Sequence, residues 1–160
     1  MKKILKVKNK EEEKFLRKKV KPFDFDSLSK KEIDDLIKQM RKTMNDADGI
    51  GLAANQVGLD ASVFVAQWEG KFYVFFNPKI EKSSSDEVEE TAEGCLSIPG
   101  NFGLTERLAK ITLIAQNKSG KQVKVKAWGM LAVIFQHEVD HLNGHLFIDR
   151  LAKGAELHNS

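Results

Sequence analysis

The chain has 160 residues, of which 41% are hydrophobic and 31% charged, a composition typical of one globular domain that buries its own core. Its net charge of +3, from 26 basic and 23 acidic residues, is too small to indicate a nucleic-acid or membrane partner. The single cysteine, Cys95, excludes an intramolecular disulfide and every cysteine-rich zinc motif.

Neither a membrane span nor a secretory signal is evident in the sequence. No stretch approaches the ~18 apolar residues that cross a bilayer. The N-terminal residues 1–5 are followed at once by Lys6 and Lys8, which leaves no apolar core for a signal peptide. We therefore expect a cytoplasmic protein without a membrane partner.

Two helices are predicted in the first third of the chain. Residues 10–17 are strongly charged and favour a short surface helix, which Pro22 closes. Ser29 and Glu32 then form a capping box, the usual start of a helix. Apolar residues recur at helical spacing from there to a stop near Gly49 and predict one buried stripe: Ile33, Leu36, Ile37, Met40 and Met44.

Strand signals dominate the middle of the chain. Alternation at 63–65 and the turn Glu69-Gly70 lead into a strand over 72–76, which we expect Asn77-Pro78 to end. A loop is expected at 83–86, before a strand over 88–93.

A hairpin and a helix follow. Residues 111–115 and 123–125 alternate on either side of a turn at 117–120. The period then changes to that of a helix over 130–143, with Gly144 as its stop. Because the strands cluster between two well-marked helices, the sequence predicts an α+β fold of antiparallel strands and hairpins around this last helix.

The last helix carries the strongest chemical signal, a His-Glu-x-x-His motif. His137 and His141 are four residues apart, so their rings project from the same side of the helix and can bind one metal ion. Glu138 adjoins the first of them, where it can act as general base on a water.

A two-histidine site needs a third ligand, and three residues are candidates. His145 follows Gly144, which turns it away from the helix face. Glu156 would serve a thermolysin-like metallopeptidase. Cys95 would complete a thiolate and two-imidazole set that leaves one position open for water.

Two further segments contain residues suited to catalysis. Gly94 precedes Cys95 and Pro99 follows it closely, so this stretch is extended and sharply positioned. Residues 49–56 are mostly small and indicate a close-packed turn into a helix, in which Gly51 admits a substrate backbone and Gln56 offers an amide donor.

In order and spacing, these three segments resemble the motifs of the peptide deformylase family. Residues 49–56 match Gly-x-Gly-Leu-Ala-Ala-x-Gln, residues 93–97 match Glu-Gly-Cys-Leu-Ser, and residues 137–141 match His-Glu-x-x-His. The resemblance extends from about residue 4 to residue 151 and implies a single catalytic domain over 1–160.

The resemblance also implies an activity and a site. The family removes the formyl group from N-formylmethionine on nascent polypeptides near the ribosome, without binding nucleic acid. By analogy Cys95, His137 and His141 bind Fe²⁺, for which Ni²⁺, Co²⁺ or Zn²⁺ can substitute. Glu138 moves a proton, while Gln56 and the backbone N–H of Leu96 stabilise the oxyanion.

The substrate is expected to lie beside the metal. Met130, Val133 and Ile134 precede His137 on the same helix face and predict an apolar pocket for the methionine side chain, with Ile50 as a further wall. The remaining residues expected to border the substrate are Gly51, Glu93 and Gly94. The carboxylates of Glu93 and Asp140 are interpreted as supporting groups around the ligands or as surface groups.

One departure from the family pattern concerns peptide recognition. Phe102 stands near a position where the family often has Arg, which leaves Arg107 as the nearest basic residue for that role. Two other classes stay open: a metallopeptidase using Glu156 or another distal ligand, and a structural metal site, which would need four protein ligands.

Overall fold

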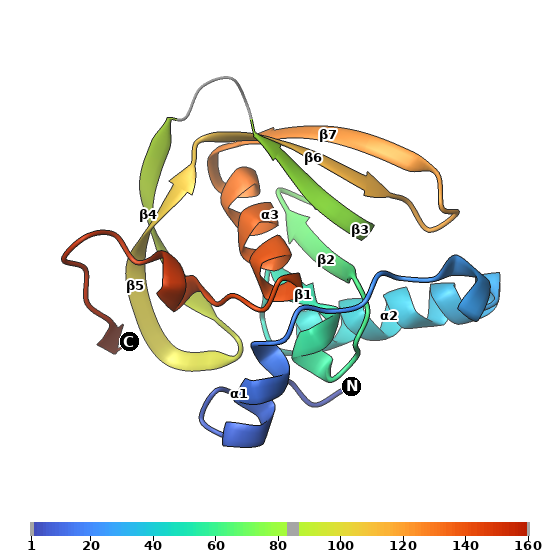
Figure 1. The fold of residues 1–160 in the computed structure, drawn as a ribbon, viewed down its shortest axis with the longest axis horizontal. Coiled ribbons are helices and arrows are strands. Elements are labelled where there is room, and N and C mark those ends of the chain that lie inside the picture. Colours follow the sequence, from blue (N-terminus) through green and yellow to red (C-terminus); the bar gives the residue numbers. More distant parts are fainter. Residues whose placement is uncertain (1, 83–86, 160) are drawn as a thin grey trace.

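Two antiparallel sheets flank a buried helix, α3 (Gly129–Leu142), in the computed structural model, which describes residues 2–82 and 87–159 (Figure 1). The larger sheet has the strand order β1-β2-β3-β6-β7. Its strands are β1 (Gly51–Ala53), β2 (Val63–Trp68), β3 (Lys71–Lys82), β6 (Lys110–Gln116) and β7 (Gln122–Trp128). The smaller sheet has the order β4-β5-β8, with β4 (Val88–Cys95), β5 (Ile98–Leu108) and β8 (His158–Asn159).

The larger sheet is covered by a helix on each face, and the alternation along β2 shows this directly. Phe64 and Ala66 belong to the core against α3, whereas Val63 and Val65 belong to the core against α2 (Lys30–Asp46). All four side chains are fully buried. A strand buried on both faces in this way has little freedom to slip in register. A shift by one residue would turn the side chains that pack against α3 toward α2, and the reverse.

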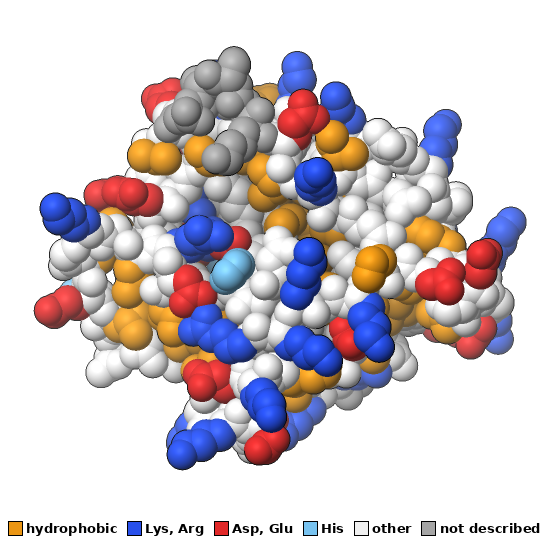
Figure 2. Space-filling model, viewed as in Figure 1, with side chains coloured by type: hydrophobic (Ala, Val, Ile, Leu, Met, Phe, Trp, Pro, Cys, Tyr) orange, Lys and Arg blue, Asp and Glu red, His pale blue; other side chains and the backbone are white. Residues whose placement is uncertain are grey.

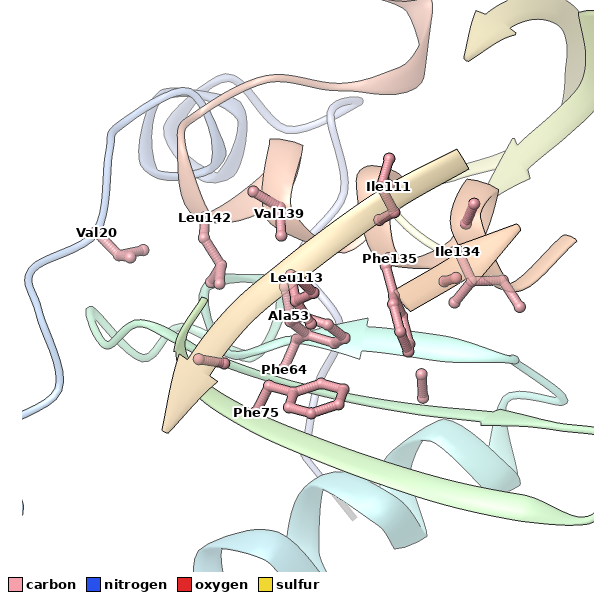
Figure 3. Packing of buried hydrophobic residues seen from close by; sticks show 14 residues of the cluster. Val20, Ala53, Phe64, Phe75, Ile111, Leu113, Ile134, Phe135, Val139 and Leu142 are labelled. Carbon is pink, nitrogen blue, oxygen red and sulfur yellow. The ribbon is translucent and has the colours of Figure 1, made fainter. Parts of the chain in front are cut away.

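The core against α3 is rich in aromatic rings (Figure 3). Phe135 of α3 has no exposed surface and lies against Phe64 and Phe75, with ring centroids 5.8 Å and 5.3 Å away. Burying one such ring stabilises the fold by roughly 1.5–3 kcal/mol. This packing fixes the rotation of α3 and therefore the side on which its histidines project.

The predicted start and end of α2 and of α3 agree with the structure within a few residues. Ser29 and Glu32 exchange the two hydrogen bonds of a capping box at the start of α2, and α2 ends at Asp46. Gly144 follows α3 with φ +83°, and a Cβ there would collide with the carbonyl of Arg17. The short charged helix is α1 (Lys10–Leu16).

The Asn77-Pro78 prediction was wrong, because β3 continues through this pair to Lys82. The pair forms a bulge: the register with β6 shifts between Phe76 and Lys79, and Asn77 has φ +49°. Proline is tolerated there because a bulge leaves its position outside the hydrogen-bonded ladder. The loop expected at 83–86 lies outside the described residues.

The remaining elements are short 3-10 helices: η1 (Phe25–Ser27), η2 (Ala54–Val57) and η3 (Phe147–Arg150). A close-packed turn into a helix was predicted for residues 49–56. In the structure this segment contains β1 and the short helix η2. Among the described residues, no helix is long and apolar enough to cross a membrane. On the face of the molecule in Figure 2, basic and acidic side chains are intermingled.

Candidate metal centre and active site

Three potential metal ligands converge where β4 ends beside the C-terminal half of α3. The ligand atoms of Cys95, His137 and His141 all lie within 4.8 Å of one another. Cys95 Sγ is 3.3 Å from His141 Nε2, which is 3.1 Å from His137 Nε2. Within residues 2–82 and 87–159 this is the one group of at least three His, Cys, Asp or Glu side chains that could hold a metal ion. Neither His145 nor Glu156 belongs to it.

The donor set and its surroundings fit a divalent cation. Burial, followed by the charge of His137, lowers the pKa of His141 well below its usual range, which keeps this imidazole in the neutral form that binds metals. Burial also disfavours the charged form of His137, but Glu138, Cys95 and Glu93 outweigh it and raise its pKa. The acidic neighbours therefore stabilise positive charge at this point, and a thiolate with two imidazoles is a sound set for a catalytic metal.

A buried chain of charges orients the first histidine. Glu93 Oε1 lies 2.7 Å from His137 Nδ1, which leaves His137 Nε2 for the metal position. Arg107 binds Glu93 with two nitrogens, at 2.7 Å and 2.9 Å, and donates to Asp140 at 2.6 Å. Burial works against the charged form of Glu93, but hydrogen bonds with His137 and Arg107 lower its pKa to about 2.

The sequence leaves Arg107 as the nearest basic residue to Phe102, but in the structure Arg107 is not available for peptide recognition. Its side chain is only 3% exposed and is committed to two carboxylates. Thr105 also donates to Glu93, so both oxygens of the Glu93 carboxylate are engaged by neighbouring side chains. These partners come from β5, and their position beside His137 cannot be read from their spacing in the sequence.

Glu138 lies next to the ligands with one oxygen uncommitted. It is 3% exposed, and its Oε1 has no hydrogen-bond partner among the described residues. Burial raises its pKa to about 7, although the charge of His137 opposes this. Gly51 of β1 makes room for it, since a Cβ on Gly51 would collide with the Glu138 carboxylate. A carboxylate with this pKa and a free oxygen is suited to accept and return a proton.

The amide of Gln56 is held in one orientation. Its Oε1 accepts a hydrogen bond from the backbone N–H of Ala53 at 3.0 Å, so its Nε2 points toward the cluster. Gln56 Nε2 lies 3.1 Å from Ser97 Oγ and 3.7 Å from Cys95 Sγ. Leu96 lies between Cys95 and Ser97 in the tight turn that joins β4 to β5.

A cavity of about 630 Å³ opens beside the cluster. All the residues expected to border the substrate line it: Ile50, Gly51, Glu93, Gly94, Met130, Val133 and Ile134. His137 and Glu138 line it as well. The N-terminal segment and β5 also contribute to its wall, through Ile4, Lys6 and Phe102.

Known proteins resemble this chain along most of its length. The model of the polypeptide deformylase family matches residues 1–156. A peptide deformylase of Halothermothrix orenii is 43% identical over 143 residues, covering 88% of this chain and 90% of that protein. The crystal structure of the Thermotoga maritima peptide deformylase superposes with a TM-score of 0.85 at 38% identity, covering 95% of this chain and 98% of the other. A Synechococcus elongatus peptide deformylase, solved in complex with actinonin, has a TM-score of 0.84 at 38% identity, over 94% and 79% of the two chains.

Proposed function

Because this chain belongs to the polypeptide deformylase family, the metal-dependent hydrolases that remove the N-formyl group from nascent peptides, we propose that its Cys95, His137 and His141 cluster is the catalytic metal centre. The chain is thus a hydrolase of protein biosynthesis that releases formate from N-terminal formylmethionine. The observation that carries the assignment of the site is the convergence of three donor atoms within 4.8 Å of one another, beside Glu138 and the cavity.

Fe²⁺ is the proposed native ion, although Ni²⁺, Co²⁺ and Zn²⁺ suit the same thiolate and imidazole donors. When bound, the ion supplies Lewis acidity, which polarises the formyl carbonyl and makes a water nucleophilic at neutral pH. Glu93 and Arg107 support this role, because Glu93 contacts His137 Nδ1 and is itself held by Arg107, which fixes the orientation of the His137 ring.

Glu138 is the proposed proton carrier. In its ionised form it takes a proton from the attacking water, and it then delivers that proton to the leaving amine of methionine. Its pKa of about 7 suits both directions of transfer near neutral pH. Its free oxygen and its place in the cavity wall support this role.

Gln56 and Leu96 are the proposed oxyanion donors. The formyl oxygen gains negative charge as water adds, and donors that are already oriented stabilise this charge without reorganising. The hydrogen bond from Ala53 to Gln56 Oε1 provides such an orientation, because it turns the amide nitrogen of Gln56 toward the cluster. The backbone N–H of Leu96 would approach from the turn after Cys95.

The apolar part of the cavity suits the methionine side chain. Ile50, Met130, Val133 and Ile134 offer four hydrophobic walls beside the metal position. Gly51 and Gly94 are proposed to border the peptide through their backbones, since the space beside their Cα atoms is taken by the Glu138 carboxylate and the Phe102 ring. Since the carboxylate of Glu93 is engaged by Arg107 and Thr105, only its backbone is left to contact substrate.

The cellular setting follows from the substrate. We infer that residues 1–160 act as one catalytic domain in the cytoplasm, near the ribosome, where formylated nascent peptides emerge. The alternatives have less support: Glu156 is exposed and lies outside the ligand cluster, and a structural site would need a fourth protein ligand.

Formate release tests the proposal directly. Protein purified anaerobically should release formate from formyl-Met-Ala-Ser in proportion to its bound iron, and should leave unformylated peptides uncut. Cys95→Ser should lower both metal content and activity. Cleavage of an internal peptide bond, or full activity in Cys95→Ser, would support a metallopeptidase instead.

A further inference from the structure

The two proposed oxyanion donors lie on segments that are 40 positions apart, and the N-terminal residues 5–7 connect them. The backbone N–H of Leu5 donates to the carbonyl of Gln56 at 2.7 Å, and that of Val7 donates to the carbonyl of Ser97 at 3.0 Å. Between these two contacts, Lys6 Nζ donates to the carbonyl oxygen of Leu96 at 2.8 Å. This short stretch therefore contacts both donor segments at once.

The main chain of Lys6 is itself held, which directs its side chain inward. Its N–H donates to Glu12 Oε2 at 3.2 Å, and the other oxygen of Glu12 pairs with Lys3 Nζ at 2.6 Å. Lys6 is half-buried and lines the cavity, whereas Lys8, two residues further on, is exposed. Lys6 thus differs from the surrounding surface lysines in both its burial and its partner.

A hydrogen bond to the Leu96 carbonyl also affects the Leu96 N–H. The carbonyl belongs to the peptide that follows Leu96 and the N–H to the peptide that precedes it. An ammonium group that holds the carbonyl therefore fixes one peptide plane of the tight turn and restrains its neighbour through the shared Cα. A charge-assisted bond is the stronger kind of hydrogen bond, and here it is made at the wall of a cavity where water is partly excluded.

We propose that Lys6 is a positioning residue for deformylation: its hydrogen bond to the Leu96 carbonyl keeps the Leu96 N–H aimed at the formyl oxygen. This inference rests on the function proposed above. It predicts an effect on turnover rather than on substrate affinity, because the donor acts on charge that appears only in the transition state.

Lys6→Met tests the proposal, with Lys8→Met as the matched control. For formyl-Met-Ala-Ser, Lys6→Met should lower kcat roughly tenfold and change KM less than twofold, since a displaced donor loses only part of its contribution. Lys6→Arg, which keeps the charge and a donor, should retain at least half of the wild-type kcat. Both methionine variants should remain folded at the assay temperature, which thermal unfolding checks.

A second measurement reports the hydrogen bond without activity. The amide nitrogen of Ser97 is bonded to the Leu96 carbonyl carbon, so its ¹⁵N resonance responds when that carbonyl loses a donor. In protein loaded with diamagnetic Zn²⁺, Lys6→Met should shift this resonance and Lys8→Met should not.

The outcomes separate this inference from the proposed function. A wild-type protein that releases no formate would overturn the function itself. An active wild-type protein with an unchanged kcat in Lys6→Met would overturn only the role of Lys6. A raised KM with unchanged kcat would also overturn it, because Lys6 would then bind the peptide rather than position a donor.

Discussion

Gly51→Ala tests whether the position of Glu138 controls turnover. The new Cβ would collide with the Glu138 carboxylate and would lie 2.8 Å from its Cδ and 3.1 Å from its Cγ. Ordinary contacts between carbon atoms begin at about 3.5 Å, so the carboxyl group must retreat by roughly 0.7 Å. A displacement near 1 Å in a catalytic group costs on the order of 10²-fold in rate. We therefore expect kcat to fall between about 10-fold and 100-fold.

The ligands are not touched by this change, so bound metal should stay at the wild-type level. Gly103→Ala is the matched control: it also adds a Cβ in a strand, but there the nearest neighbour is the flexible end of Leu151, 2.6 Å away. It should leave kcat within about twofold of wild type, because Gly103 does not line the cavity.

Combining Gly51→Ala with Glu138→Asp separates crowding from other effects. The shorter aspartate leaves space for the added methyl group, so Gly51→Ala should cost less in the Glu138→Asp background than in wild type. The assay is formate release at saturating substrate, together with metal analysis of each variant. A Gly51→Ala protein that keeps more than half of the wild-type kcat, or equal losses in both backgrounds, would refute the reasoning.

Four further outcomes are expected. Glu138→Ala should keep its metal and lose at least ~10²-fold in kcat, because the proton carrier is removed but no ligand is; normal turnover in the metal-replete variant would contradict this. Arg107→Met should lower the free energy of unfolding in urea by about 3–5 kcal/mol, since it leaves Glu93 buried without its counter-charge and deprives Asp140 of one partner; a smaller loss would mean that water reaches these carboxylates. Val133→Trp should raise KM for formyl-Met substrates more than it lowers stability, and equal effects would make Val133 an ordinary core residue. Among reconstituted forms followed for hours in air, iron should be the most active and decay through oxidation of the metal and its thiolate, nickel and cobalt should persist, and zinc should turn over slowly; an air-stable iron form would argue against the account.

The ligand pair on α3 could be predicted because its geometry is local. Residues four apart on a helix project from the same side wherever the helix lies, and the structure places His137 and His141 with Nε2 atoms 3.1 Å apart. Cys95 is different, because it lies 42 positions before the first histidine, and a separation of that length in the sequence does not determine how far apart two side chains lie in the fold. Its candidacy came from the chemistry of a third ligand and from the resemblance of residues 93–97 to a family motif.

The strand β5 was missed for a physical reason. Its buried side carries Gly103, Thr105 and Arg107, while Phe102 and Leu104 are exposed, which inverts the usual alternation of apolar and polar residues. Polar side chains are stable inside only when partners satisfy them, and here those partners come from β4 and α3. The order of apolar and polar residues along one strand contains no information about partners on other elements.

Local regularities in the sequence determined the helices, the hairpin of β6 and β7, and the spacing of the histidines, because helix and strand periods depend on neighbours within a few residues. The tertiary structure alone decided how Glu93, Arg107 and Asp140 join behind His137, and how Lys6 comes to lie on the Leu96 carbonyl. Those contacts join residues up to 90 positions apart. The packing of α3 between the two sheets brings the charged residues together, and the backbone hydrogen bonds of Leu5 and Val7 hold Lys6 beside Leu96. Buried charges and hydrogen-bond donors acquire their roles from such partners, so their function appears only once the chain has folded.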